Sequence, residues 1–184
     1  MPKNYSESKQ KWYVITGGPS SGKTTILKEL GKIGYITYPE TSRSLIDKEK
    51  AHGETLKEIR GDEAKFQRKV LEMKVQAEKR APKNKIIFFD RAIPDSIAYY
   101  QVCGLDGKEV LKFCKRKIYK KVFFLEQLPV KKDYARTENN KTVRKLNQFL
   151  KEAYKKLGYN VVDIPVTPVE KRVALILKEV KNTF

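Results

Sequence analysis

Short apolar runs alternate with longer amphipathic stretches along this chain of 184 residues. The apolar runs have the length of strands, and the amphipathic stretches repeat apolar residues at helical spacing. The pattern predicts strands over residues 11–16, 35–39, 85–89, 120–126 and 160–164. It predicts helices over residues 24–33, 42–50, 62–81, 94–103, 108–116, 142–157 and 168–180. Strands separated by helices predict a parallel sheet with right-handed crossovers, which is an α/β fold.

The length of the chain is that of one domain, and the sequence contains no internal repeat and no low-complexity linker. We expect the polar residues 1–10 to form a flexible tail and residues 11–184 to form a single domain. The polar connection at 127–141 is long for a loop inside a compact domain. It is therefore predicted to be a mobile functional segment, or lid.

The sequence carries 40 Lys and Arg against 22 Asp and Glu, a formal net charge of +18. Such a charge attracts polyanions, among them nucleic acid, nucleotides and acidic membranes. Lysine also decorates helix faces without binding anything, and acidic residues interrupt the basic ones almost everywhere. A nucleic-acid partner is therefore possible but not favoured, and the oligomeric state is not predicted.

The apolar runs also bear on where the protein acts. No window approaches the roughly 20 apolar residues of a membrane span. The polar start lacks the apolar core of a signal peptide. The two cysteines cannot form a disulfide framework, and no Cys and His set has zinc-ligand spacing. We expect a cytoplasmic protein without a membrane span.

Residues 17–24, GGPSSGKT, match the pattern G-x-x-x-x-G-K-[ST] in full, between a predicted strand and a predicted helix. In such a loop, backbone N–H groups converge on phosphate oxygens at a helix N-terminus. Lys23 could then reach the β- and γ-phosphates, and the Thr24 hydroxyl could bind Mg²⁺. A glycine-rich turn capped by Thr24 is the alternative. The predicted nucleotide contacts are Gly17, Gly18, Pro19, Ser20, Ser21, Gly22, Lys23, Thr24 and Thr25.

The third predicted strand ends in Asp90, which Arg91 follows. In proteins with a phosphate loop such an aspartate lies near Mg²⁺, usually through a water, although many strands end in Asp for turn reasons. Arg91 could clamp the substrate or the transferring phosphate, or lie on the surface. Asp95 and Tyr99 share a helix face and could contact a ring-bearing acceptor. Alternatively, Asp95 complements the helix dipole and Tyr99 is a buried aromatic residue.

Glu40 and Arg43 follow the second predicted strand, so they face the same crevice as the phosphate loop. Glu40 could align an acceptor hydroxyl or deprotonate it, with a near-normal pKa, because phosphoryl transfer needs no strong base. Arg43 could hold the acceptor or its phosphate. In the alternative, Glu40 caps the next helix. Within the predicted lid, Arg136 could bring positive charge to the phosphoryl group, or form a surface pair with Glu138.

The chain resembles a family of small stand-alone P-loop proteins that are loosely labelled AAA-type ATPases. The resemblance rests on GGPSSGKTT, PETSR, FFDR with PDSIAYY, FFLEQLPVKKDYARTEN and AYKKLGYNVVDIPVTPVEKRVALIL, and spans about Lys11 to Val180. That family is similar to ribosylnicotinamide kinase domains and, more distantly, to deoxynucleoside and thymidylate kinases. The chain looks too short for the helical lid domain of true AAA machines, and no second-region arginine finger is identifiable.

The resemblance implies a three-layer P-loop fold with a five-stranded parallel sheet of order 2-3-1-4-5. It implies that Glu40, Asp90 and Arg91 occupy acceptor and metal positions, that Arg136 belongs to the lid, and that Pro165–Pro168 lies near the adenine.

The resulting hypothesis is a phosphotransferase that uses MgATP, or GTP, and a nucleoside-like or ribose-like hydroxyl acceptor. An acceptor-independent ATPase or switch and a polynucleotide 5′-kinase are the alternatives. The predicted catalytic residues are Lys23, Glu40, Asp90, Arg91 and Arg136. The predicted metal ligands are Thr24 and Asp90, and the predicted acceptor contacts are Glu40, Arg43, Arg91, Asp95 and Tyr99.

Overall fold

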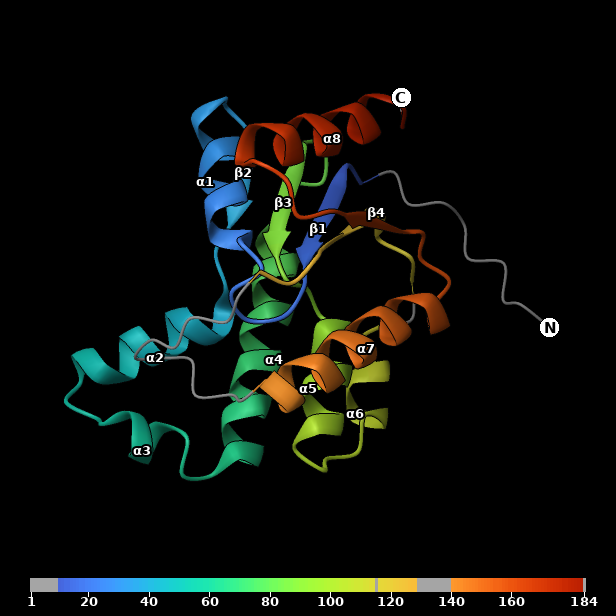
Figure 1. The fold of residues 1–184 in the computed structure, drawn as a ribbon. Helices are drawn as coiled ribbons and strands as arrows, with labels where there is room; N and C mark the ends of the chain where they lie inside the picture. The colour runs from blue at the N-terminus through green and yellow to red at the C-terminus, as the bar shows by residue number, and fades with distance from the viewer. Residues whose placement is uncertain (1–9, 115, 129–139, 184) are drawn as a thin grey trace.

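The computed structural model describes residues 10–114, 116–128 and 140–183 (Figure 1). Five strands form one sheet in the order β2-β3-β1-β4-β5, with every neighbouring pair parallel. The strands are β1 (Trp12–Thr16), β2 (Ile36–Tyr38), β3 (Ile87–Asp90), β4 (Tyr119–Leu125) and β5 (Val161–Ile164). Both the predicted α/β class and the predicted strand order are confirmed.

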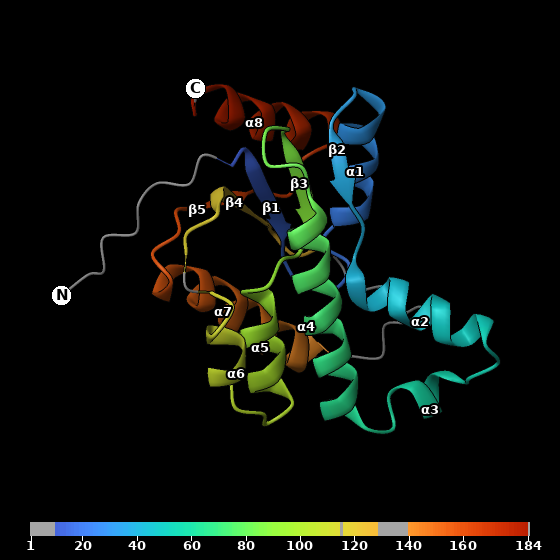
Figure 2. The same cartoon turned by 180° about the vertical axis from the view of Figure 1, so that it is seen from behind.

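Helices cover both faces of this sheet (Figure 2). They are α1 (Lys23–Lys32), α2 (Thr41–Ala51), α3 (Leu56–Ile59), α4 (Glu63–Arg80), α5 (Asp95–Val102), α6 (Lys108–Leu111), α7 (Asn140–Lys156) and α8 (Val169–Lys181). Successive strand residues point to opposite faces. Ile15 therefore joins Leu30 of α1 and Ile176 of α8 in one core cluster, while Val14 joins Tyr154 of α7 in another.

Three elements differ from the sequence prediction. The edge strand β2 is only three residues long, and α6 ends at Leu111 instead of near residue 116. The one-turn helix α3 was not predicted, although the sequence has the Thr-x-x-Glu motif that is typical of a helix start. There Thr55 and Glu58 form a capping box, in which each side chain accepts from the other residue's backbone N–H.

The parallel strands all end at one edge of the sheet, where ligands of such folds bind. The phosphate loop follows β1, Glu40 follows β2, and Arg91 follows β3. Residues 1–9 of the predicted tail and most of the predicted lid, with Arg136, lie outside the described residues. In the part of the chain that is described, no helix is long and apolar enough to cross a membrane.

Candidate active site

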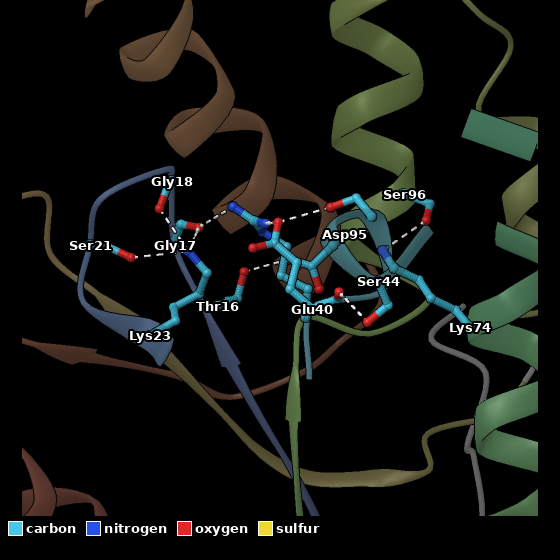
Figure 3. A network of polar contacts seen from close by, with 12 residues as sticks. Thr16, Gly17, Gly18, Ser21, Lys23, Glu40, Ser44, Lys74, Asp95 and Ser96 are labelled. Carbon is cyan, nitrogen blue, oxygen red and sulfur yellow. Dashed lines mark hydrogen bonds and ion pairs between the residues drawn. The ribbon is translucent and has the colours of Figure 1, made fainter. Parts of the chain in front are cut away.

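The phosphate loop joins β1 to α1 and depends on glycine at its two ends. Gly17 and Gly22 have φ angles of 138° and 91°, in the region that favours glycine. A Cβ on Gly17 would lie 2.7 Å from the backbone oxygen of Leu125, so the loop also requires a residue without a side chain at this position. The loop wraps around the buried Lys23 amine, which donates to the backbone oxygens of Gly17 (3.1 Å) and Gly18 (2.8 Å) (Figure 3).

Two side-chain amides hold the outer part of this loop. Asn147 of α7 accepts a hydrogen bond of 2.7 Å from the Gly18 N–H and donates one of 3.2 Å to Gln127. Gln127 in turn donates to the backbone oxygen of Pro19 at 2.7 Å. Neither residue was predicted, because a single amide in a helix or a connection forms no recognisable pattern.

Arg91 joins the ends of three strands. Its guanidinium donates to the carboxylate of Glu40, which follows β2, and to the backbone oxygen of Gly17 at 3.1 Å, which follows β1. Its charged group also lies 5.2 Å from the ring centre of Tyr99. The backbone of Arg91 is left-handed, with φ of 62°, and its N–H donates to the backbone oxygen of Ile15. This conformation turns the side chain back across the edge of the sheet.

Glu40 occupies the position before α2, but its side chain makes no capping bond to that helix. Its carboxylate accepts from Arg91 and from the Ser42 hydroxyl at 2.9 Å. Burial by itself would raise the pKa of Glu40, but the positive charges of Arg91 and then Lys23 lower that pKa to about 2. The expectation of a near-normal pKa was therefore wrong, because it left out the arginine that the fold places against the carboxylate.

Asp90 and Thr24 line one cavity at the carboxyl edge of the sheet. The Oδ1 atom of Asp90 is buried and has no hydrogen-bond partner within the described residues. Burial, and then the negative charge of Glu40, raise the pKa of Asp90 to about 7. A buried carboxylate oxygen without a donor, beside an exposed hydroxyl, fits a Mg²⁺ ion, which prefers oxygen ligands and keeps several waters.

A second cavity, of about 690 Å³ including its open mouth, begins at the phosphate loop and extends between α2 and α4. It has the size of a small-molecule pocket. Six residues that the sequence analysis predicted to be catalytic or to contact the acceptor line this pocket together. They are Lys23, Glu40, Arg43, Asp90, Arg91 and Tyr99. Pro19 also lines it, whereas Thr25 is exposed on α1.

The α4 wall of this pocket contains residues that the sequence analysis missed. Phe66, Gln67, Val70 and Lys74 line it. The buried Lys74 amine donates to the Ser96 hydroxyl at 3.0 Å (Figure 3), and burial lowers the pKa of Lys74. Gln67 and Lys74 lie three residues before and four residues after Val70, so they share its helix face. That spacing was visible in the sequence beside the apolar stripe of α4.

Asp95 does not line the pocket. Its side chain is fully buried, at 0% exposure, and accepts a hydrogen bond from the Thr16 hydroxyl (Figure 3). It also accepts hydrogen bonds from the Tyr154 hydroxyl and the Ala92 N–H. The structure therefore corrects the expectation that Asp95 contacts an acceptor. Helix α5 begins with this residue directed towards β1 and α7, so Asp95 fastens the turn that carries Asp90 and Arg91.

A sequence model of a protein family described as an AAA domain matches residues 12–172. The chain belongs to this family. No protein with a curated description matches the sequence of this AAA-domain protein. The family assignment confirms the resemblance found in the motifs.

Solved structures share the fold of this AAA-domain protein. Deoxyadenosine kinase from M. mycoides has a TM-score of 0.62 and 19% identity, over 94% of this chain and 100% of that chain. Thymidylate kinase from Ehrlichia chaffeensis has a TM-score of 0.64 and 16% identity, over 95% and 100%. The NadR protein in complex with NR has a TM-score of 0.68 and 16% identity, over 95% of this chain and 50% of NadR. At such identities the likeness establishes the fold, and function has to be argued from the site.

Proposed function

We propose that the protein is a MgATP-dependent phosphotransferase that moves the γ-phosphate to a hydroxyl of a small nucleoside-like or ribose-like acceptor. One observation carries this proposal. The Lys23 amine, the Glu40 carboxylate and the Arg91 guanidinium all line the pocket that opens beside the phosphate loop. A kinase needs such a second compartment for its acceptor, whereas hydrolysis of ATP requires only water there.

On the donor side, backbone N–H groups of the phosphate loop would hold the triphosphate, and Lys23 would neutralise charge at the β- and γ-phosphates. Thr24 and Asp90 would hold Mg²⁺, which supplies charge neutralisation of the phosphate oxygens when bound. ATP and GTP are both compatible with this part of the site, because it involves only the phosphates.

On the acceptor side, Glu40 would accept a hydrogen bond from the acceptor hydroxyl and hold it in line with the phosphoryl group. A carboxylate whose pKa is about 2 is a weak base, which suits alignment better than early removal of a proton. The transition state of phosphoryl transfer is loose, so positioning and charge supply most of the catalysis. Arg91, held by Glu40, would stabilise the charge on the transferred group, and Arg136 would add a second positive charge from the lid.

The remainder of the pocket suits a ring with polar edges. Phe66 and Val70 present apolar surface, and Gln67 offers an amide that both donates and accepts. Arg60 also lines the pocket, and its charged group lies over the Phe66 ring, 5.1 Å from the ring centre, which holds the ring in place. The deoxyadenosine kinase, the thymidylate kinase and the NR-bound NadR that share the fold are named for ring-bearing compounds, which supports the same acceptor class here.

The test is ADP release from MgATP with and without a panel of acceptors. The panel holds nucleosides, nucleoside monophosphates, ribosylnicotinamide and 5′-hydroxyl oligonucleotides. We expect one small acceptor to stimulate ADP release. Lys23→Ala should reduce that stimulated rate by about 10³-fold, because it removes a charge contact of the transition state. Lys32→Ala, which alters an exposed lysine on the same helix, is the matched control and should change little.

Two outcomes contradict the proposal. Stimulation by oligonucleotides alone would indicate a polynucleotide kinase, and binding should then weaken steeply with salt. Slow ADP release that no acceptor changes would indicate an ATPase or a nucleotide-dependent switch.

A further inference from the structure

Arg172, on the first turn of α8, is 2% exposed, and its guanidinium donates hydrogen bonds to three main-chain oxygens. Nη1 donates to Ser21 at 2.8 Å, Nη2 to Glu126 at 3.0 Å, and Nε to Pro165 at 2.8 Å. A planar guanidinium presents its donors in a rigid fork, so it can bind three carbonyls in fixed directions at once.

These three carbonyls belong to three separate segments at the carboxyl edge of the sheet. Ser21 lies in the phosphate loop, Glu126 follows β4, and Pro165 follows β5. Figure 1 shows the start of α8 beside α1, which the phosphate loop precedes. Gly22 leaves room for this contact, because a Cβ there would lie 3.1 Å from Nη1 of Arg172. The arginine therefore sets the spacing between the phosphate loop and the segment Pro165–Pro168.

The segment Pro165–Pro168 has unused binding capacity. Val166 is 52% exposed although it is apolar, and the Thr167 hydroxyl is buried without a hydrogen-bond partner among the described residues. A hydrogen bond also fixes the backbone of Val166, since its N–H donates to the Glu126 carboxylate at 3.4 Å. Apolar surface beside an unused hydroxyl suits a flat, nitrogen-rich ring such as a nucleobase.

We propose that Arg172 is a positioning residue that fixes the donor's base site on Pro165–Pro168 at a set distance from its phosphate site. This inference rests on the proposed function, because it requires a nucleoside triphosphate on the phosphate loop. Arg172 itself touches protein carbonyls and not the nucleotide. Its effect is to let one rigid ligand fill both sites together, without a cost for ordering either segment.

The test compares two ligands, MgATP and magnesium tripolyphosphate, by calorimetric titration. Tripolyphosphate probes the phosphate loop alone, whereas ATP probes the loop and the base segment together. In the wild-type protein we expect tighter binding of ATP than of tripolyphosphate. Arg172→Lys keeps the positive charge but loses the planar guanidinium, with its N–H donors in fixed directions. It should reduce the ratio of the two affinities by about tenfold, as expected for the loss of oriented, charge-assisted hydrogen bonds.

Lys121→Met is the matched control. Lys121 of β4 binds α8 through the backbone oxygen (3.0 Å) and the carboxylate (2.7 Å) of Glu179, away from the phosphate loop. This variant should lower the melting temperature and leave the affinity ratio unchanged. Val166→Asp changes an exposed side chain, so the variant provides a test even if Arg172→Lys does not fold. It should weaken the binding of ATP but not the binding of tripolyphosphate.

The inference would be overturned if Arg172→Lys left the ratio of the ATP and tripolyphosphate affinities unchanged, including the case in which it weakens the binding of both ligands equally. An unchanged affinity of Val166→Asp for ATP would also overturn it. A wild-type protein that binds neither ligand would instead refute the proposed function, and the inference would fall with it. Binding of ATP with failure of every acceptor would remove the kinase proposal and leave the role of Arg172 intact.

Discussion

Arg91 donates a hydrogen bond from its guanidinium to the carboxylate of Glu40, so that the residues after β3 and β2 form one ion pair at the floor of the pocket. The two side chains are 3% and 17% exposed, which shields the pair from water. Removing one partner of such a pair leaves the other charge unpaired. Each side chain therefore holds the other in place.

Glu40→Gln keeps the shape of the side chain and removes its charge. We expect acceptor-dependent turnover to fall by about 10²-fold or more, in the range of a lost acid–base or aligning group. The affinity for MgATP should change by less than about threefold, because the carboxylate hydrogen-bonds to Arg91 and Ser42, and the proposed role of Glu40 is on the acceptor side. Steady-state kinetics with a direct ATP titration separate the two effects. Equal losses in both would place Glu40 on the donor side.

Asp95→Asn should destabilise the protein by about 2–4 kcal/mol, because a buried carboxylate with three internal donors is replaced by an amide that must oppose one of them. Asp163→Asn is the matched control. Its side chain is 53% exposed and pairs with Lys151 at 2.6 Å, so it should cost less than about 1 kcal/mol. Urea denaturation of both variants checks the difference. Similar costs would contradict a structural role for Asp95.

Two glycines that differ in their surroundings give a paired prediction. A Cβ on Gly18 would lie 2.7 Å from Asn147 Oδ1 and 2.8 Å from Gln127 Oε1. Gly18→Ala should therefore displace both amides, cost about 1–2 kcal/mol and weaken ATP binding. A Cβ on Gly31 of α1 would lie 3.8 Å from Thr37 Oγ1, an ordinary van der Waals contact, so Gly31→Ala should stabilise the protein by about 0.5–1 kcal/mol.

A second variant distinguishes the loss of the hydrogen bond between Gly18 and Asn147 from a general loss of packing. Asn147→Ala should weaken ATP binding as Gly18→Ala does, and the double variant should lose little more, because both remove the same hydrogen bond. Additive losses measured by denaturation and ATP titration would show that the two residues act independently.

Glu78, on α4, gives a pH-dependent prediction for stability. Burial raises its pKa from 4.5 to about 7, against hydrogen bonds from the Tyr119 hydroxyl and from the Ile93 N–H at 3.3 Å. Between these two pH values the folded protein keeps a proton that the unfolded chain has lost. Stability from this group is therefore full below pH 4.5 and declines as the pH rises towards 7.

Glu78→Gln resembles the protonated form and should remove this decline. We expect the variant to gain stability relative to the wild-type protein between pH 5 and pH 8, by an amount on the order of 2 kcal/mol. Guanidinium denaturation at both pH values measures it. Parallel stability curves for the two proteins would show that Glu78 has the same pKa in the folded and unfolded states.

Much of the fold could be predicted because its signals are local. Apolar runs of strand length, amphipathic stretches and a full phosphate-loop pattern predicted the parallel sheet and its helices, whereas the strand order was implied by the resemblance to a known family. The pairing of Glu40 with Arg91 is a contact across 51 positions, and no local pattern encodes it. The same holds for Arg172, which sits in the charged run VEKR that is typical of an exposed helix start.

Asp95 shows the converse error. Its position four residues before Tyr99 predicted a shared face, but which face of α5 turns towards β1 is decided by packing. The Thr16 and Tyr154 hydroxyls that bind its carboxylate come from β1 and α7. A spacing argument identifies neighbours on one helix, and it contains no information about the element opposite.

Transfer of phosphate to an organic acceptor can be measured by following the label of γ-³²P-ATP. Incubated with the acceptor that stimulates ADP release, the wild-type protein should place the label in a phosphorylated acceptor, with little inorganic phosphate. Glu40→Gln should slow formation of that product while ATP still binds. Label that appears only in inorganic phosphate, at a rate that no acceptor changes, would show that the protein hydrolyses ATP and is not a kinase.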